Sequence, residues 1–583
     1  MRRLLMLSFA LALLGAACTN SGDDTSSTSS VPAASSSSSS ITVATTTTTT
    51  SPPDGFGGEI RLGVDLPIAS LNPFSQDAFG ERLAGNAVWA MVYDIDPETW
   101  ERMPDTVVSL PSQSDSIEVN DDGTMTVRYD VRVDARWSDG LSISGEDVAF
   151  TAEAMRALAI AGEPSVHPIM ATVVSTDFVE QIAFITFAEP NLVFEDALWI
   201  ILPSHALDGV DLVDGSDGSD WPSGGPFIVE SFGRFNEARF VRNDLYWKED
   251  DSGRSLPYID QFTIVESTEP DLQGNEPASP TSGFVAGELD VAVIPPWPED
   301  LARVAGVADQ GATFETVASS VVEQITVQFA GDRDEANPVS WNDLLAYRQA
   351  VAHAIDRDVI LEETGVPWSD GVPGMLIPGA GSAWTQYDYD PQAAGALIDE
   401  LGDETEEGTP QARLSTTGNG DYRIRIGDAL EPRFAAIGVG YEPIYLDSVL
   451  FFGDTLATGA FDLGMWAWLR DGGYQSTLNL MDIFDPANDA AQADLGNWAS
   501  TASSGADRFS EIVDAVRSTI DADRFAELVA EAEQILADEL VVIPLFNRST
   551  TAAWWTDAVD GVVANGSQST LTWNVEEWQR VGE

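Results

Sequence analysis

Residues 459–473 constrain the fold of this chain more than any other segment, because a short apolar run ends there abruptly in a charged, glycine-rich turn. The apolar part fits a buried strand, on which Gly464, Trp466 and Trp468 would share one face. A strand end that points into a crevice is a common ligand site in α/β proteins. The stretch therefore predicts a strand end at which two indole rings lie side by side, close to Asp471.

Two interpretations of this stretch stay open on the residues alone. Indole faces attract cations and a carboxylate pairs with them, so Trp466, Trp468 and Asp471 suit a ligand with apolar parts and a cationic head. Alternatively, both tryptophans belong to the core and Asp471 is a solvated turn acid.

The N-terminus predicts export. An apolar run at residues 4–14 follows two arginines, is too short to span a bilayer comfortably, and leads through small residues to Cys18. Cys18 is the only cysteine, so the fold has no intramolecular disulfide and must depend on its cores. The segment resembles a bacterial lipobox, although Gly15 replaces the usual branched residue. That resemblance implies a signal peptide over residues 1–17 and a lipid on Cys18; a cleaved signal with an incidental thiol is the alternative.

Residues 18–54 are rich in Ser, Thr, Ala and Pro. This composition cannot bury enough apolar surface to fold, so we predict a flexible, lipid-anchored linker. No other segment is long and apolar enough to cross a bilayer. We therefore expect the protein on the outer face of the cytoplasmic membrane, at the cell surface or in the periplasm.

The net charge of −67, from 28 Lys+Arg against 95 Asp+Glu, argues against nucleic acid and anionic lipid headgroups as partners. Adaptation to salty water explains such a surface, and so does a genomic bias towards Arg codons in an acidic exported protein. Enzyme signatures are missing as well. The three histidines, His167, His205 and His353, are widely spaced, and neither a nucleophile elbow nor a phosphate-binding loop is present. We expect no catalytic residues, no metal and no cofactor; a secreted hydrolase is the weakest alternative.

Local patterns predict several elements. Ser144 with Asp147 three residues later predicts the start of a helix, and Pro391 and Gly402 suggest the start and end of another. Residues 86–93 predict a short helix. Predicted strands cover residues 57–66, 125–133, 182–187, 199–202 and 541–546.

A series of motifs follows in a fixed order along nearly the whole folded body. They lie at residues 137–140, 144–151, 201–205, 223–227, 241–247, 287–290, 347–360, 389–402, 435–439 and 464–468. Together they resemble the extracellular solute-binding proteins, family 5, of peptide-type ABC importers. The resemblance implies an α/β fold: a two-lobe periplasmic-binding-protein clamp of type II, in the large peptide-binding subclass, with a hinge between the lobes. It places lobe I at residues 55–310, lobe II at residues 311–540, and the return to lobe I at residues 541–583.

The resemblance also implies a ligand site. In peptide-binding members a Trp-x-x-Asp segment supplies the acid that pairs with the ligand's ammonium group, and the spacing of Trp468 and Asp471 matches it. This implies Asp471 as the amine partner and Trp468 as a pocket wall, with Trp466 and Tyr474 as further pocket residues. Arg470 is atypical of the motif; it could pair with Asp471 or face the ligand's carboxylate.

We accordingly expect a monomeric substrate-binding lipoprotein. It would capture short peptides, or related amine-bearing solutes, for the permease and ATPase subunits of an ABC importer. A nickel chelate or an oligosaccharide stays open as cargo. The alternative from another class is a surface lipoprotein that keeps the clamp for sensing or adhesion.

Overall fold

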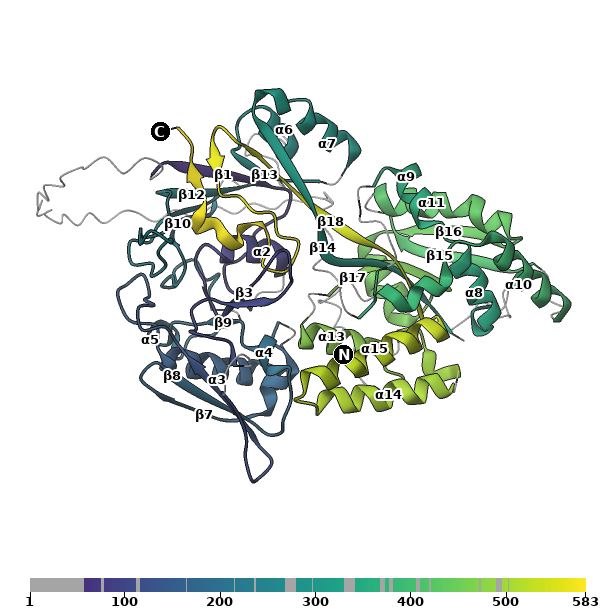
Figure 1. Cartoon of the computed structure of the whole chain (residues 1–583), viewed down its shortest axis with the longest axis horizontal. Helices are drawn as coiled ribbons and strands as arrows, with labels where there is room; N and C mark the ends of the chain where they lie inside the picture. Colours follow the sequence, from purple (N-terminus) through teal and green to yellow (C-terminus); the bar gives the residue numbers. More distant parts are fainter. Residues whose placement is uncertain are drawn as a thin grey trace, which may run out of the picture.

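A mixed sheet of ten strands runs through the computed structural model (Figure 1). Its order is β10 (Phe227–Arg234), β11 (Glu237–Arg242), β12 (Gln261–Glu266), β1 (Glu59–Val64), β13 (Val291–Ile294), β18 (Val542–Trp555), β14 (Ala312–Val327), β17 (Leu463–Leu469), β15 (Gln411–Thr417) and β16 (Gly440–Leu446). The structure describes residues 57–74, 78–111, 116–163, 165–213, 215–234, 237–267, 279–295, 297–329, 341–366, 368, 373–376, 381–404, 409–418, 421–470, 473–488, 495–501 and 503–582.

Two long strands, β14 and β18, connect the two halves of this sheet and run side by side across the molecule (Figure 1). One half of the β14–β18 ribbon joins the sheet through β13, and the other half joins it through β17. The pairing of β14 with β18 is irregular between Ala318 and Val322. We call the part built on β10, β11, β12, β1 and β13 the first lobe, and the part built on β17, β15 and β16 the second lobe. The chain is thus a two-lobe α/β clamp.

The first lobe is centred on β1, whose residues Ile60, Leu62 and Val64 are fully buried. This strand pairs in parallel with β12 and β13. Its further strands are β2 (Ala90–Met91), β3 (Tyr93–Ile95), β4 (Arg102–Pro104), β5 (Ile117–Val119), β6 (Met125–Asp130), β7 (Val173–Val179), β8 (Ile182–Phe187) and β9 (Ile200–Ile201). Its helices are α2 (Ala78–Gly85), α3 (Gly145–Ala161), η3 (Pro168–Thr172), α4 (Phe194–Ala197), α5 (Ser204–Leu207), α6 (Pro280–Val285), α7 (Pro298–Ala305) and η4 (Ala308–Gln310).

The second lobe is richer in helices, which surround β15, β16 and β17 (Figure 1). They are η5 (Trp341–Asp343), α8 (Leu345–His353), α9 (Arg357–Thr364), η6 (Gly381–Tyr387), α10 (Pro391–Glu404), α11 (Asp421–Ala436), α12 (Ser448–Leu450), the π-helical η7 (Phe451–Leu456), α13 (Tyr474–Phe484), η8 (Trp498–Thr501), α14 (Ser504–Arg517) and α15 (Ala522–Glu539).

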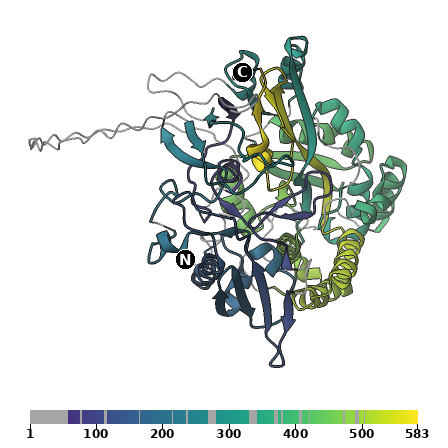
Figure 2. The ribbon, with the colours of Figure 1, turned by 60° about the vertical axis from the view of Figure 1, so that its left-hand side comes forward.

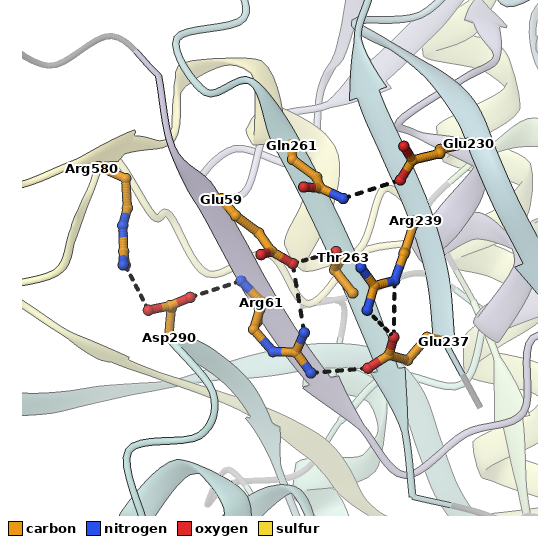
Figure 3. A network of polar contacts seen from close by, with 9 residues as sticks. All are labelled: Glu59, Arg61, Glu230, Glu237, Arg239, Gln261, Thr263, Asp290 and Arg580. Atoms are coloured by element: carbon orange, nitrogen blue, oxygen red, sulfur yellow. Dashed lines mark hydrogen bonds and ion pairs between the residues drawn. The ribbon is translucent and has the colours of Figure 1, made fainter. Parts of the chain in front are cut away.

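The C-terminal segment returns to the first lobe. It forms β19 (Val559–Asp560), η9 (Leu571–Glu577) and β20 (Gln579–Arg580), and η9 lies beside α2 (Figure 2). Thr572 donates a hydrogen bond to the Leu83 carbonyl at 2.8 Å. At the sheet, Asp290 accepts from the Arg61 backbone N–H at 2.9 Å and from the Arg580 side chain at 2.6 Å (Figure 3). These bonds attach the chain end to α2 and to β1.

Most predicted elements are confirmed, and one is wrong. The predicted strands match β1, β6, β8, β9 and β18, and α3 begins after the N-cap residue Ser144, whose N–H donates to Asp147 at 2.9 Å. The helix predicted at residues 86–93 is instead a turn followed by β2 and the start of β3. Tertiary pairing decides this segment, because β2 pairs with β9 and β3 pairs with β4.

Candidate functional site

The predicted strand around the two indoles is confirmed as β17. It pairs antiparallel with β14, with Trp466 opposite Gln324 and Trp468 opposite Val322. The two indoles contact each other edge to face, with ring centroids 6.1 Å apart and planes at 73°. Trp466 is 1% exposed, whereas Trp468 is partly exposed. Trp468 is therefore the indole that a ligand could reach without displacing the core.

An aromatic cluster encloses Trp466. Its ring packs against Phe461 at 5.8 Å and against Phe451 of the π-helical η7 at 6.0 Å. A single π-helical turn is frequent at functional sites. Neither indole N–H of Trp466 and Trp468, nor the buried Nε2 of Gln324, meets an acceptor in the described part of the chain. This face of β14 and β17 thus carries buried N–H groups of a kind that suits a carbonyl or carboxylate oxygen.

Arg470 follows β17 directly and is 1% exposed. Its guanidinium group donates to the carbonyl of Gly374 and to the side chain of Asn547, on β18. Burial lowers its pKa to about 10, while Glu533 acts in the opposite direction. Arg470 therefore joins the end of β17 to β18, and its contact with a ligand stays a prediction. Asp471 lies outside the described residues, so its predicted role is untested.

Tyr474 is the first residue of α13. Its half-buried ring packs edge to face against Phe525, with centroids 4.8 Å apart. Burial raises the pKa of its hydroxyl to about 12, and the nearby Glu195 carboxylate adds to the shift. Because Glu195 belongs to α4 of the first lobe, Tyr474 lies at a contact between the lobes. Its role in a pocket stays a prediction.

The centre of this contact is Asp196, which is 5% exposed. Its carboxylate forms an ion pair with Arg102 in the first lobe and accepts the Gln475 backbone N–H from the second lobe at 2.6 Å. The N–H groups in the first turn of a helix have no partner within the helix, and they attract negative charge. Gly473 lies so close that a Cβ atom there would be 2.6 Å from Asp196 Oδ2. We call this contact between α4 and the start of α13 the latch.

His167 adds a further link between the lobes beside the latch. Its Nδ1 accepts the Ile169 N–H at 3.0 Å, which leaves the proton of a neutral ring on Nε2. The side chain of Asn479, on α13, lies near this ring and opposes the lowering of its pKa. Burial lowers the pKa of His167 to about 4, so the ring is neutral at pH 7.

Sequence patterns had not indicated Arg102, Asp196 or His167 as residues between the lobes. Asp196 and Gln475 are 279 positions apart, and a periodicity argument does not reach such a distance. The scarcity of basic residues, 28 against 95 acidic ones, was the available signal for Arg102, because it makes each arginine a candidate ion-pair partner.

In the described residues, no cluster of three or more His, Cys, Asp and Glu side chains has the arrangement of a metal site. Among the helices of that same part of the chain, none combines the length and the apolar character that a membrane span requires.

Comparisons with known proteins agree with this architecture. A "Probable ABC transporter-binding protein" of Deinococcus radiodurans is 24% identical over 325 residues, covering 50% of this chain and 52% of that protein. The "Oligopeptide-binding protein OppA" of Bacillus subtilis is 25% identical over 364 residues, covering 60% of each chain. The chain thus spans just over half to three-fifths of the length of these two relatives.

Solved structures show the same fold. A periplasmic EDTA-binding protein, EppA, superposes with a TM-score of 0.72 at 20% identity, covering 93% of this chain and 100% of that one. The oligopeptide-binding protein AppA of Bacillus subtilis, in complex with a nonapeptide, superposes with a TM-score of 0.63 at 16% identity, covering 91% and 100%. The family model of the bacterial extracellular solute-binding proteins, family 5, matches residues 110–491, more than half of the chain. With the two-lobe fold, this match establishes that the chain belongs to the family 5 extracellular solute-binding proteins.

Proposed function

We propose that this protein is the substrate-binding lipoprotein of an ABC importer, anchored through Cys18 and delivering short peptides or related amine-bearing solutes to a permease. The names of the relatives support the peptide class, since one is an oligopeptide-binding protein and one fold neighbour holds a nonapeptide. The observation that carries the proposal concerns two described residues on either side of Asp471. Trp468, near the end of β17, is partly exposed, and Gly473 lies against the opposite lobe.

The proposed site has an amine end at Asp471, because an ammonium group taken out of water needs a fixed anion. Trp468 would form the wall of the pocket. We further propose a hinge in β14 and β18, at the irregular pairing between Ala318 and Val322, with lobe boundaries at residues 55–310, 311–540 and 541–583.

Closure would follow from contacts that exist in one state only. A ligand shifts the equilibrium between open and closed forms only by its differential affinity for them. The latch would be a contact of this kind, because Asp196 and Gln475 belong to different lobes. A ligand held between the lobes would favour closure and with it the surface that a permease recognises.

A metal chelate is the second candidate cargo, since the fold neighbour EppA is described as an EDTA-binding protein. A surface lipoprotein for sensing or adhesion remains the alternative from another class. A carboxylate-rich chelate would favour the donor face of β14 and β17 over the amine end of the site.

The test is native mass spectrometry of a soluble form that begins near Asp54, recorded before and after refolding with a pool of di- to hexapeptides. Captured peptide masses that disappear in Asp471→Asn would support both the cargo and the amine end. Capture that survives Asp471→Asn would keep the cargo and reject the site. Well-folded protein that captures EDTA chelates but no peptide would reject the peptide cargo.

A further inference from the structure

We propose that Arg548 and Tyr422 form a carboxylate-binding site at the junction of the two lobes. The inference deepens the proposed function, on which it rests, by specifying that the cargo carries a carboxylate group. The site lies on β18 and α11, at the irregular part of the β14–β18 pairing.

A buried ion triad is the basis of the site. Glu323 is 0% exposed and accepts from Arg423 Nε at 2.6 Å and from Arg548 Nη2 at 2.6 Å. One carboxylate shared by two guanidinium groups leaves one positive charge unbalanced within the triad. Arg423 uses another donor on Thr417 at 2.6 Å and is 2% exposed. The surplus charge is therefore accessible at Arg548, whose side chain is 16% exposed.

The donors of Arg548 are only partly used. Nε and Nη2 bind Glu323, and Nη2 also donates to the Tyr422 hydroxyl at 2.9 Å. Nη1 has no acceptor in the described residues. Because the Tyr422 oxygen accepts from Arg548, its own proton is available to a ligand. Nη1 and this hydroxyl together offer donors to both oxygens of one carboxylate.

Aromatic rings flank these donors. The Arg548 guanidinium group lies 4.8 Å from the Tyr422 ring centroid and 5.5 Å from that of Trp368. Trp297, which precedes α7 in the first lobe, approaches Tyr422 with centroids 5.9 Å apart. Arg425 covers the Trp297 ring at 5.1 Å. A carboxylate at Arg548 would therefore lie where both lobes meet, among surfaces that exclude water and strengthen the ion pair.

The charge of the whole protein limits the ligand class. At a net charge of −67 the molecule repels polyanions at long range, and one unbalanced guanidinium charge attracts a single carboxylate at short range. The solute that fits both conditions is small and carries no large negative charge. A short peptide with a terminal ammonium and a terminal carboxylate meets this description.

The test compares trialanine with trialanine amide by calorimetry on the purified full chain, in the native protein, Tyr422→Phe and Arg548→Lys. Tyr422→Phe keeps the ring and removes the hydroxyl proton. The matched controls are Tyr445→Phe, whose hydroxyl bonds Asp428 at 2.7 Å, and Arg413→Lys, which pairs with Glu442 at the surface. We expect the amide to bind about 10-fold or more weakly than the acid in the native protein and in both controls. The ratio of the dissociation constants of the amide and the acid should fall towards one in the two site variants, Tyr422→Phe and Arg548→Lys.

Equal affinity for trialanine and its amide would overturn the inference and leave the proposed function intact. So would a native preference for the acid that persists undiminished in both site variants. If trialanine does not bind, the same proteins are heated with benzoate and with benzamide. Stabilisation by benzoate alone, lost in Tyr422→Phe, would keep the carboxylate site and reject the peptide cargo. No response to any carboxylate would overturn the inference.

Discussion

Asp196→Asn should weaken ligand binding by opening the latch. The substitution keeps the size of the side chain but removes the charge that attracts the Gln475 N–H, 2.6 Å away on the opposite lobe. Hydrogen bonds to charged groups contribute about 1.5–3 kcal/mol and neutral ones about 0.5–1.5 kcal/mol, and the Asn oxygen can still accept a neutral bond. If this bond forms only in the closed state, the difference of about 1–1.5 kcal/mol changes the closing equilibrium, and hence the affinity, by about 5- to 12-fold.

The substitution has a second effect, which the assay must separate. Arg102 and Asp196 both belong to the first lobe, so their ion pair survives opening. Breaking a buried pair by removing one partner costs about 3–5 kcal/mol of folding stability in either state. Urea unfolding measures that loss, and calorimetry with a captured ligand measures the affinity.

Gly473→Ala provides an independent test of the latch. It changes no charge, but its Cβ would lie 2.6 Å from Asp196 Oδ2 and so should push the lobes apart. The matched control for Asp196→Asn is Asp130→Asn, because Asp130 pairs with Arg128 on β6, whose side chain is 44% exposed. Unchanged affinity in both latch variants, with both proteins folded, would refute the reasoning.

Three further predictions concern stability. Glu323→Gln should lower the free energy of unfolding by about 3–5 kcal/mol, because it leaves two guanidinium groups without their shared anion. Urea unfolding measures this loss. The control Glu442→Gln should lose less than about 1 kcal/mol, because Glu442 is 61% exposed. The pKa of His167 is lowered from 6.5 to about 4, so the neutral ring contributes its full stability above pH 6.5, and this contribution is lost as the pH falls towards 4. In His167→Gln, the free energy of unfolding should therefore change less between pH 6.5 and pH 4. An identical pH profile in the variant would contradict the assignment. The Tm should rise between 0.1 and 1 M NaCl, because the Debye length shrinks from about 10 Å to about 3 Å and screens the net charge of −67; a constant or falling Tm would contradict this.

Local patterns sufficed for elements whose environment repeats along the chain. The alternation of Ile60, Leu62 and Val64 matches their full burial in β1, and Ser144 with Asp147 marks the start of α3. The apolar run at residues 86–93 gave a wrong helix prediction. The whole segment is buried, so its apolar residues do not show the two-residue alternation of a half-buried strand. Pairing with β9, which is distant in sequence, and with the nearby β4 makes strands of it.

The candidate site also has one part that local sequence patterns predict and another that they do not. The common face of Trp466 and Trp468 follows from the two-residue period of a strand. The contacts of Arg470 with Gly374 and Asn547 depend on how three separate segments pack. Arg548 and Glu323, 225 positions apart, meet because β14 and β18 are neighbours. The residue types alone do not indicate which residues so far apart in the sequence will be in contact.

Cargo capture should close the clamp. Small-angle X-ray scattering of the soluble form, with and without a saturating captured peptide, measures this closure. We predict a smaller radius of gyration with peptide in the native protein and a weaker contraction in Asp196→Asn at the same occupancy. A saturated native protein with an unchanged radius of gyration would contradict it.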